Sequence, residues 1–298
     1  MESSSLYNTR TIKEDRSKGF DIKEEIIMVV QHNMQAVNTN RMLGQNVKAV
    51  QKSTEKLSSG YAVNRAADDA AGLSISEKMR NQIRGLNQSV KNAEDGISLI
   101  QTAEGNMNEI HSILQRMGEL AIKARNDVNA SEDRRSINDE VVQLKAEISA
   151  ITTKAEFNGT KLLNGGMSKG KTLQVGANMG ETMAISIKGT SLSNLGLSDT
   201  SVSTGLKAST AIGKIQSAIK NVSAQRSLLG AIQNRLEYTI NNLENYSENL
   251  TSAESNIRDT DMATEMVNYS KNNILQQAAQ SMLSQANQST QGVLNLLQ

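Results

Sequence analysis

The chain has 298 residues and a net charge of +1, with 32 basic and 31 acidic residues mixed along it. It contains no proline, cysteine or tryptophan, and 2% of its residues are aromatic. Because no basic stripe is present, we expect no nucleic-acid partner. The lack of cysteine excludes disulfides and thiolate metal sites. No apolar run approaches the roughly 20 residues of a membrane span, so we expect no membrane partner.

The missing proline favours long helices, because proline removes a backbone donor and clashes with the preceding turn. The low aromatic content argues against a thick globular core. Leu, Ile, Val, Met and Ala supply most of the apolar surface, and these residues commonly fill the seams between packed helices. The composition therefore predicts an elongated, mainly helical protein.

Residues 1–27 are polar, mixed in charge and without sustained periodicity, which is typical of a disordered extension. Within them, KEEIIM (23–28) could be encoded by a purine-rich ribosome-binding site followed by a start codon. We therefore hypothesise that Met28 is the true initiator. A translated disordered arm is the alternative.

An apolar stripe with helical spacing follows residue 28, and a connector bounded by glycines covers residues 58–72. A longer stripe then runs from Met79 to Ala124, with spacings that mostly alternate between 4 and 3 as in a coiled-coil seam. It predicts a helix of about 50 residues, roughly 75 Å long. Ser131 is expected to cap the next helix, which reaches about residue 155.

The middle of the chain, residues 156–206, is rich in Gly, Ser, Thr and Asn. Its segments TLQVG (172–176) and TMAISIKG (182–189) flank a turn and predict a β-hairpin. The helical seam resumes at Ala208 and continues to Ile257. We therefore expect a mainly α fold, an elongated antiparallel helical bundle or coiled coil with a small β-hairpin element in the middle of the chain.

The two terminal stripes lie on short helices that bury too little apolar surface to be stable as a pair. We expect them to order on assembly, so that the chain is a polymer subunit. An ordinary coiled-coil scaffold or adhesin is the alternative. The predicted polymerisation core is Val30, Met34, Val37, Val47, Val50, Leu57, Leu275, Met282, Val293 and Leu297.

Several segments resemble one known family. Residues 56–105, beginning KLSSGYAVNRAADDAAGLSISEKMR, resemble the N-terminal signature of bacterial flagellins, and residues 229–288, including NIRDTDMATEMVNYSKNNILQQA, resemble the C-terminal one. EFNGTKLLNG (156–165) and LQVGAN (173–178) are similar to the family's small β element. A hook–filament junction protein shares the plan of terminal helices and is the alternative within flagellar proteins.

The resemblance implies a structural subunit of the flagellar filament that lacks the large outer domains. It also implies secretion to an extracellular filament, and as partners many copies of the chain, an export chaperone, the flagellar secretion apparatus and the filament cap. The implied organisation is an extension (1–27), an N-terminal inner-core helix with its connector (28–72), a rod (73–258) containing the β element (156–206), and a C-terminal inner-core helix (259–298).

A recognition patch is implied at LQRMGEL (114–120). In the resembled family this stretch faces the neighbouring subunit and, in the free monomer, the host Toll-like receptor for flagellin. The implied contacts are Arg116, Leu120 and, on the next helix, Glu140. Gly118 stands where strong agonists carry a second arginine. Plain subunit-packing surface is the alternative for the whole patch.

The segment GGMSKGKT (165–172) matches the phosphate-loop pattern G-x-x-x-x-G-K-[ST]. That chemistry needs a buried strand before the loop and a helix N-terminus after it, whereas here a turn-rich segment leads in and a hairpin is predicted to follow. His32 and His111 are far apart in sequence and belong to no metal-binding motif. We therefore expect no enzymatic activity, no cofactor and no metal site.

Overall fold

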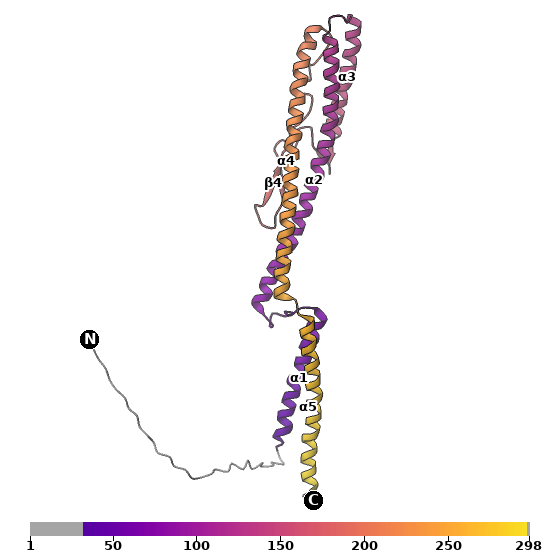
Figure 1. Ribbon diagram of the computed structural model, residues 1–298. Coiled ribbons are helices and arrows are strands. Elements are labelled where there is room, and N and C mark those ends of the chain that lie inside the picture. Colours follow the sequence, from indigo (N-terminus) through magenta and orange to yellow (C-terminus); the bar gives the residue numbers. More distant parts are fainter. Residues whose placement is uncertain (1–31, 297–298) are drawn as a thin grey trace, which may run out of the picture. The chain divides into compact units, whose positions relative to one another are not determined.

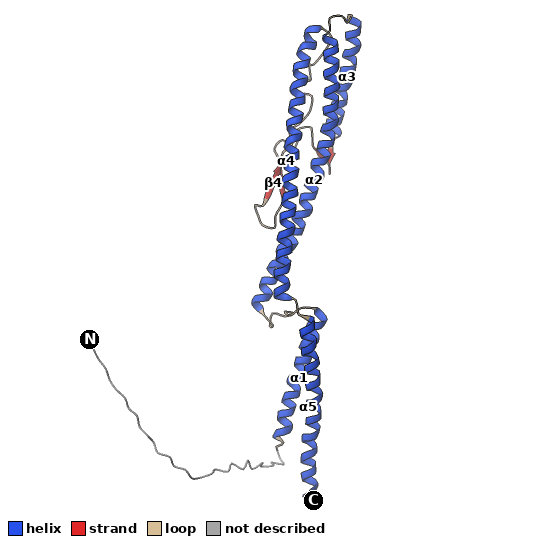
Figure 2. Cartoon of the chain, viewed as in Figure 1, coloured by secondary structure: helices blue, strands red, loops and turns tan. Residues whose placement is uncertain are grey.

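The computed structural model describes residues 32–296, and side-chain burial for residues 32–292. The proposed extension, residues 1–27, lies outside this part of the chain. The helices, blue in Figure 2, are α1 (Met34–Ser59), α2 (Ala70–Arg125), α3 (Ser131–Lys154), α4 (Gly205–Arg258) and α5 (Met262–Leu296). The strands are β1 (Glu156–Phe157), β2 (Thr160–Lys161), β3 (Lys171–Gln174) and β4 (Thr182–Ile185). The prediction of a mainly helical chain with a small β element is confirmed.

The chain divides into two compact units. One unit combines the residues up to Glu55 with those from Ala263 onward, and therefore holds most of α1 and α5. The other, Lys56–Met262, is called the rod unit below and contains α2, α3, α4 and all strands.

In the rod unit, α2 and α4 run antiparallel side by side, and α3 lies along the half of α2 nearer Arg125 (Figure 1). α2 has 56 residues and α4 has 54, as expected for a chain without proline. The first turn of α2 is capped by Asp69, whose side chain accepts a hydrogen bond from the Gly72 N–H at 2.9 Å. This cap stabilises the start of the longest helix.

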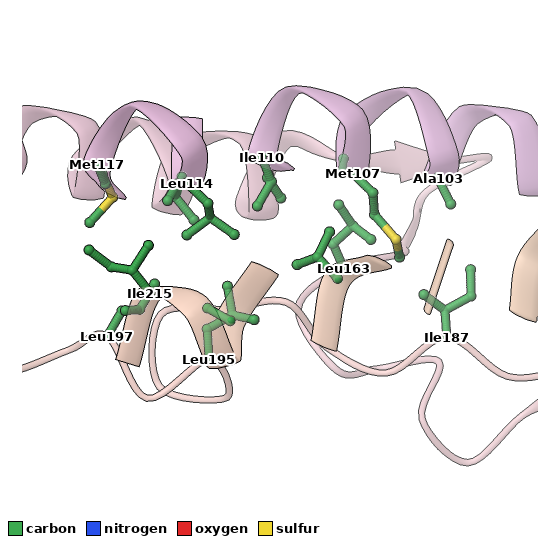
Figure 3. Packing of buried hydrophobic residues seen from close by; sticks show 14 of the residues in the cluster. Ala103, Met107, Ile110, Leu114, Met117, Leu163, Ile187, Leu195, Leu197 and Ile215 are labelled. Atoms are coloured by element: carbon green, nitrogen blue, oxygen red, sulfur yellow. The ribbon is translucent and has the colours of Figure 1, made fainter. Parts of the chain in front are cut away.

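The core of the rod unit is made by the predicted seam of α2 and by apolar side chains from the middle segment and α4. Figure 3 shows Met107, Leu114 and Met117 of α2 pointing toward Leu163 and Ile215. The buried stripe of α2 is Leu86, Ala93, Ile100, Ala103, Met107, Ile110, Leu114, Met117, Leu120, Ala121 and Ala124. Nearer the start of α2, Met79 and Ile83 are only half-buried, because α3 does not reach that end of the helix.

The predicted β-hairpin is confirmed: β3 pairs antiparallel with β4, with Leu173 opposite Met183. The hairpin packs on α2 at Gly96, where an added Cβ would lie 2.6 Å from Leu173 Cδ2. This close approach explains why a helical position that is buried carries a glycine.

One local prediction needs correction. Ser131 is the first residue of α3 and not its cap; the N-cap is Ala130, whose N–H donates to Asp133 Oδ2 at 3.1 Å. The segment before the phosphate-loop match contains a short hairpin of β1 and β2, neither of which is a buried strand. Its turn is Asn158–Gly159, both with positive φ, which is a sequence signature of tight hairpins.

Candidate functional site

Two connector segments of the rod unit pair with each other next to the ends of α2 and α4. Tyr61 and Asp259 form an antiparallel bridge. On either side of it, the Ala62 N–H donates to the Arg258 carbonyl at 2.7 Å and the Thr260 N–H donates to the Gly60 carbonyl at 3.0 Å. The segment near the start of the rod unit and the segment near its end are therefore hydrogen-bonded to each other in a short ladder.

Side chains hold this ladder in place, and we call this group the connector clasp: Tyr61, Glu77, Arg80, Glu254 and Arg258. The Tyr61 ring has the guanidinium of Arg258 at 4.8 Å and that of Arg80 at 5.4 Å from its centroid. Arg80 also donates to the Tyr61 hydroxyl and to Glu254, each at 3.1 Å, and Arg258 donates to Glu77 at 2.8 Å. Two cation–π contacts and three charge-assisted hydrogen bonds thus join α2, α4 and the first connector.

The charges of the clasp shift the pKa of two of its members. The hydrogen bond from Arg258 lowers the pKa of Glu77, and the positive charge of Arg80 adds to that effect. Burial alone would lower the pKa of Arg80, but its hydrogen bond with Tyr61 and the charge of Glu254 raise it. Both shifts favour the charged forms that make the clasp.

In the other unit, α5 has two different faces. A partly buried stripe repeats with heptad spacing, but most of its members are polar or small: Glu265, Tyr269, Asn272, Gln276, Ala279, Leu283, Ala286 and Thr290. A separate set of apolar side chains is exposed, with Val267 at 68% and Ile274 at 66%. Leu275 and Met282, both predicted for the polymerisation core, belong to this exposed set.

The remaining residues predicted for the polymerisation core fall into three groups. Met34 and Val37 of α1 are exposed. Val47, Val50 and Leu57 are partly buried along the same helix. Val30 and Leu297 lie outside the described residues, and for Val293 only the helical backbone is described.

The unit that holds most of α1 and α5 buries few of its described side chains. The Asn33 side chain donates to the Ala286 carbonyl at 2.9 Å and links the start of α1 to α5. Among residues with described side chains, Ser53 of α1 and Ala286 of α5 are the buried ones in these helices. Neither is a large apolar residue, so this pair has little hydrophobic stabilisation of its own.

The predicted recognition patch is built on α2 and α3. The Arg116 guanidinium donates to Glu140 Oε1 from Nε at 3.1 Å and from Nη2 at 3.0 Å, and to Glu119 Oε2 at 3.1 Å. Hydrogen bonds with Glu140 and then Glu119 raise the pKa of Arg116. Arg116 and Glu140 are exposed and lie together on the surface.

Leu120 does not lie on that surface. It is 3% exposed and belongs to the apolar core. Its position is part of the buried stripe because it follows Met117 by one helical turn. Gly118 is oriented toward α4, since an added Cβ would lie 3.7 Å from Ile215 Cγ2. Leu120, an implied contact of the patch, is therefore a core residue in this structure.

At the phosphate-loop match, the residue that follows Gly170 is Lys171, which begins β3, so the predicted hairpin and not a helix comes after the loop. His32 is exposed and His111 lies on α2 with its Nε2 3.2 Å from the Gln115 amide nitrogen. Within residues 32–296, no group of three or more His, Cys, Asp or Glu side chains could hold a metal ion. No helix in the same described part of the chain is long and apolar enough to cross a membrane.

A rod of long helices with paired connectors, together with terminal helices that expose apolar side chains, is an architecture typical of structural subunits. Comparison with known families agrees with this class. The model of the bacterial flagellin N-terminal helical region matches residues 30–168, and that of the C-terminal helical region matches residues 212–297. The chain belongs to the bacterial flagellin family.

Individual relatives give the same result. A flagellin of Halalkalibacterium halodurans is 52% identical over 91% of this chain and 100% of its own length. A flagellar filament 33 kDa core protein of Treponema phagedenis is 46% identical, again over 91% of this chain and 100% of its own length. The chain is thus a structural subunit of the bacterial flagellar filament, used in motility, and it is short enough to lack the large outer domains.

The fold alone does not distinguish filament subunits from flagellar hook-associated proteins. The structure of a putative flagellar hook-associated protein from Vibrio parahaemolyticus superposes with a TM-score of 0.55 at 13% identity, covering 64% of this chain and 100% of that one. That similarity concerns the fold. The two family models and the high identity to flagellins are what favour a filament subunit over the junction-protein alternative.

Proposed function

We propose that the exposed apolar faces of α1 and α5 are the surfaces through which copies of this chain pack in the filament. The observation that carries the proposal is the arrangement on α5, where the partly buried stripe is mainly polar and Val267, Ile274, Leu275 and Met282 stay exposed. Apolar surface of this kind gains stability when it is removed from water, at about 25 cal/mol per Å². A second copy of the same helices supplies a matching surface.

The face on α1 fits the same role. Met34 and Val37 are three positions apart and share one side of the helix. They are exposed, whereas Leu43 and Val50 belong to the partly buried side. A polymer that covers both sides of α1 would stabilise a helix that packs poorly within one chain.

The test is seeded polymerisation of a charge variant with a matched control. Leu275→Asp places a charge in the exposed apolar face of α5 and is expected to stop elongation, because an unpaired buried charge is strongly unfavourable. Gln277→Asp adds the same charge on a polar, exposed side of α5 and is expected to elongate normally. Normal elongation of both variants, measured by sedimentation, would show that this face is not a packing surface.

We further propose that the chain is exported through the flagellar secretion apparatus, kept unassembled by an export chaperone, and added at the tip under the filament cap to an extracellular filament. The exposed apolar residues of α5 support a chaperone, since they would promote premature association. Without cysteine or proline, neither disulfide formation nor prolyl isomerisation would slow refolding after export. A co-purification of the chain from cells, with and without residues 263–298, tests whether a chaperone is held by this segment.

The free monomer is also proposed to engage a host Toll-like receptor. The supporting observation is the surface pair of Arg116 and Glu140, which presents charged groups from two helices at one place. Leu120, being buried, would act only by positioning α2. Binding of the monomer to the receptor ectodomain, compared with binding of the intact filament, tests this role.

A further inference from the structure

Among residues 32–292, most methionines are either buried in the rod core or exposed to solvent. Met107, Met117 and Met167 are sealed in the rod core, at 0% or 1% exposure. The terminal helices carry the opposite kind: Met34 is 71% exposed and Met282 61%. Met42, Met262 and Met266 are also exposed on α1 and α5, and Met179 is fully exposed at the tip of the β3–β4 hairpin. Solvent therefore reaches the thioether sulfurs mainly on the helices that lie outside the rod core.

The chain has no cysteine, so methionine supplies all of its oxidisable sulfur. A peroxide converts the thioether to a sulfoxide in a two-electron step. The sulfur gives up an electron pair, the O–O bond breaks, one oxygen bonds to sulfur and the other leaves as water. The flexible apolar side chain becomes a polar one with a strong hydrogen-bond acceptor.

We propose that Met34 and Met282 are sulfoxidation sites that control assembly, so that peroxide-class oxidants hold the chain as a monomer. Met282 follows Leu275 by two helical turns, and both are exposed. Met34 lies beside Val37 on the exposed side of α1. A sulfoxide at either position places an acceptor without a partner in the apolar face.

This inference rests on the proposed packing role of those faces. Burying a polar group without a hydrogen-bond partner is unfavourable enough to lower an association constant by about tenfold or more. Conversely, packing removes the sulfur from solvent, so assembled subunits are protected. Met179, on the rod unit, carries an exposed thioether outside those faces and serves as an internal reference.

The experiment treats purified monomer with hydrogen peroxide, maps sulfoxides by peptide mass spectrometry, and then measures seeded elongation. In the folded monomer, Met34, Met179 and Met282 are expected to oxidise at least about tenfold faster than Met107 and Met117. The oxidised monomer is expected to elongate at least about tenfold more slowly than untreated monomer. Treatment with a methionine sulfoxide reductase and a thiol reductant is expected to restore elongation.

A variant with both Met34→Leu and Met282→Leu keeps an apolar side chain of similar size and is expected to elongate after the same peroxide treatment. The matched control, Met179→Leu, is expected to lose elongation as wild type does. Equal loss in the double-leucine variant and in wild type would overturn the inference, as would unchanged elongation of oxidised wild type. Circular dichroism of each treated monomer confirms that the rod stays helical.

The outcome separates this inference from the proposed function. If oxidised wild type elongates normally while Leu275→Asp does not, the sulfoxide control is wrong and the packing role stands. If Leu275→Asp also elongates normally, the packing role itself fails. Elongation that is lost on oxidation and recovered both by the leucine variant and by the reductase supports the two together.

Discussion

The guanidinium carbon of Arg258 lies 4.8 Å from the centroid of the Tyr61 ring, although the two residues are almost 200 positions apart. Tyr61 lies in the connector before α2, and Arg258 is the last residue of α4. The contact and the Tyr61–Asp259 bridge both join the two connectors. We expect the connector clasp to keep the two connector segments paired with each other.

Replacing Tyr61 by leucine is expected to loosen that ladder. The change removes both cation–π contacts and the hydrogen bond from Arg80. Hydrogen exchange at the Ala62 and Thr260 amides should accelerate several-fold, because each contact contributes roughly 0.5–1 kcal/mol. Tyr61→Phe, which keeps the ring, should show a smaller effect, and Tyr238→Leu at an exposed tyrosine of α4 should show none. Unchanged exchange in Tyr61→Leu would mean that the ladder does not depend on the ring.

The clasp should also weaken in acid. The pKa of Glu77 is lowered below its ordinary value of 4.5 in the folded chain. Its stabilising effect is therefore fully present above pH of about 4.5 and is lost as pH falls through the lowered pKa. In wild type, the protection of the Thr260 amide, meaning its exchange rate relative to the intrinsic rate at the same pH, should fall over that range. Glu77→Gln should already exchange faster at neutral pH and lose part of this acid dependence, whereas Glu94→Gln, at an exposed glutamate of α2, should behave as wild type.

Gly118→Ala is expected to stabilise the rod unit. Alanine is favoured over glycine within a helix by about 1 kcal/mol, and the new methyl group would contact Ile215 Cγ2 at 3.7 Å without a clash. The midpoint of urea unfolding should rise. Gly105→Ala is the matched control on α2, because its Cβ would meet no atom within 4 Å and it gains helix propensity alone. A larger rise for the Gly105 variant would contradict the contact with Ile215.

Arg116→Ala is expected to weaken binding of the monomer to the receptor by about tenfold, since charge-assisted hydrogen bonds are the stronger ones. Glu140→Ala should have a related effect, because it releases the guanidinium from its fixed position. Arg135→Ala, at an exposed arginine of α3, serves as control. Equal affinity of all variants in a titration would show that the pair is packing surface only.

Much of the fold could be predicted from the sequence because apolar residues recur along it at regular spacings. The seam from Met79 to Ala124 shows as apolar residues spaced three and four apart, and the hairpin of residues 172–189 shows as alternation every second residue. Both elements are present in the structure. The burial of Leu120 is also predictable from the sequence, because Leu120 continues the same apolar stripe beyond Met117. Helical periodicity alone therefore places Leu120 in the core, whereas the family resemblance implies a contact there.

The connector clasp could not be predicted in the same way. Tyr61, Arg80 and Arg258 lie in three separate segments, and charged or aromatic residues at such positions have no period that marks them as partners. Only the antiparallel pairing of α2 and α4 brings them together. The cap of α3 differs from the prediction for a local reason. Asp133, inside the helix, accepts the hydrogen bond from the Ala130 N–H, so the helix begins without a serine side chain as its cap.

The most direct test of the assembly account is electron microscopy of purified monomer after addition of filament seeds, for the full chain and for a chain lacking residues 263–298. The full chain is expected to extend the seeds into long helical filaments. The truncated chain is expected to stay a helical monomer, because it has lost the exposed apolar face of α5 while keeping the rod core. Filaments grown from the truncated chain would contradict the claim that the terminal helices form the polymer core.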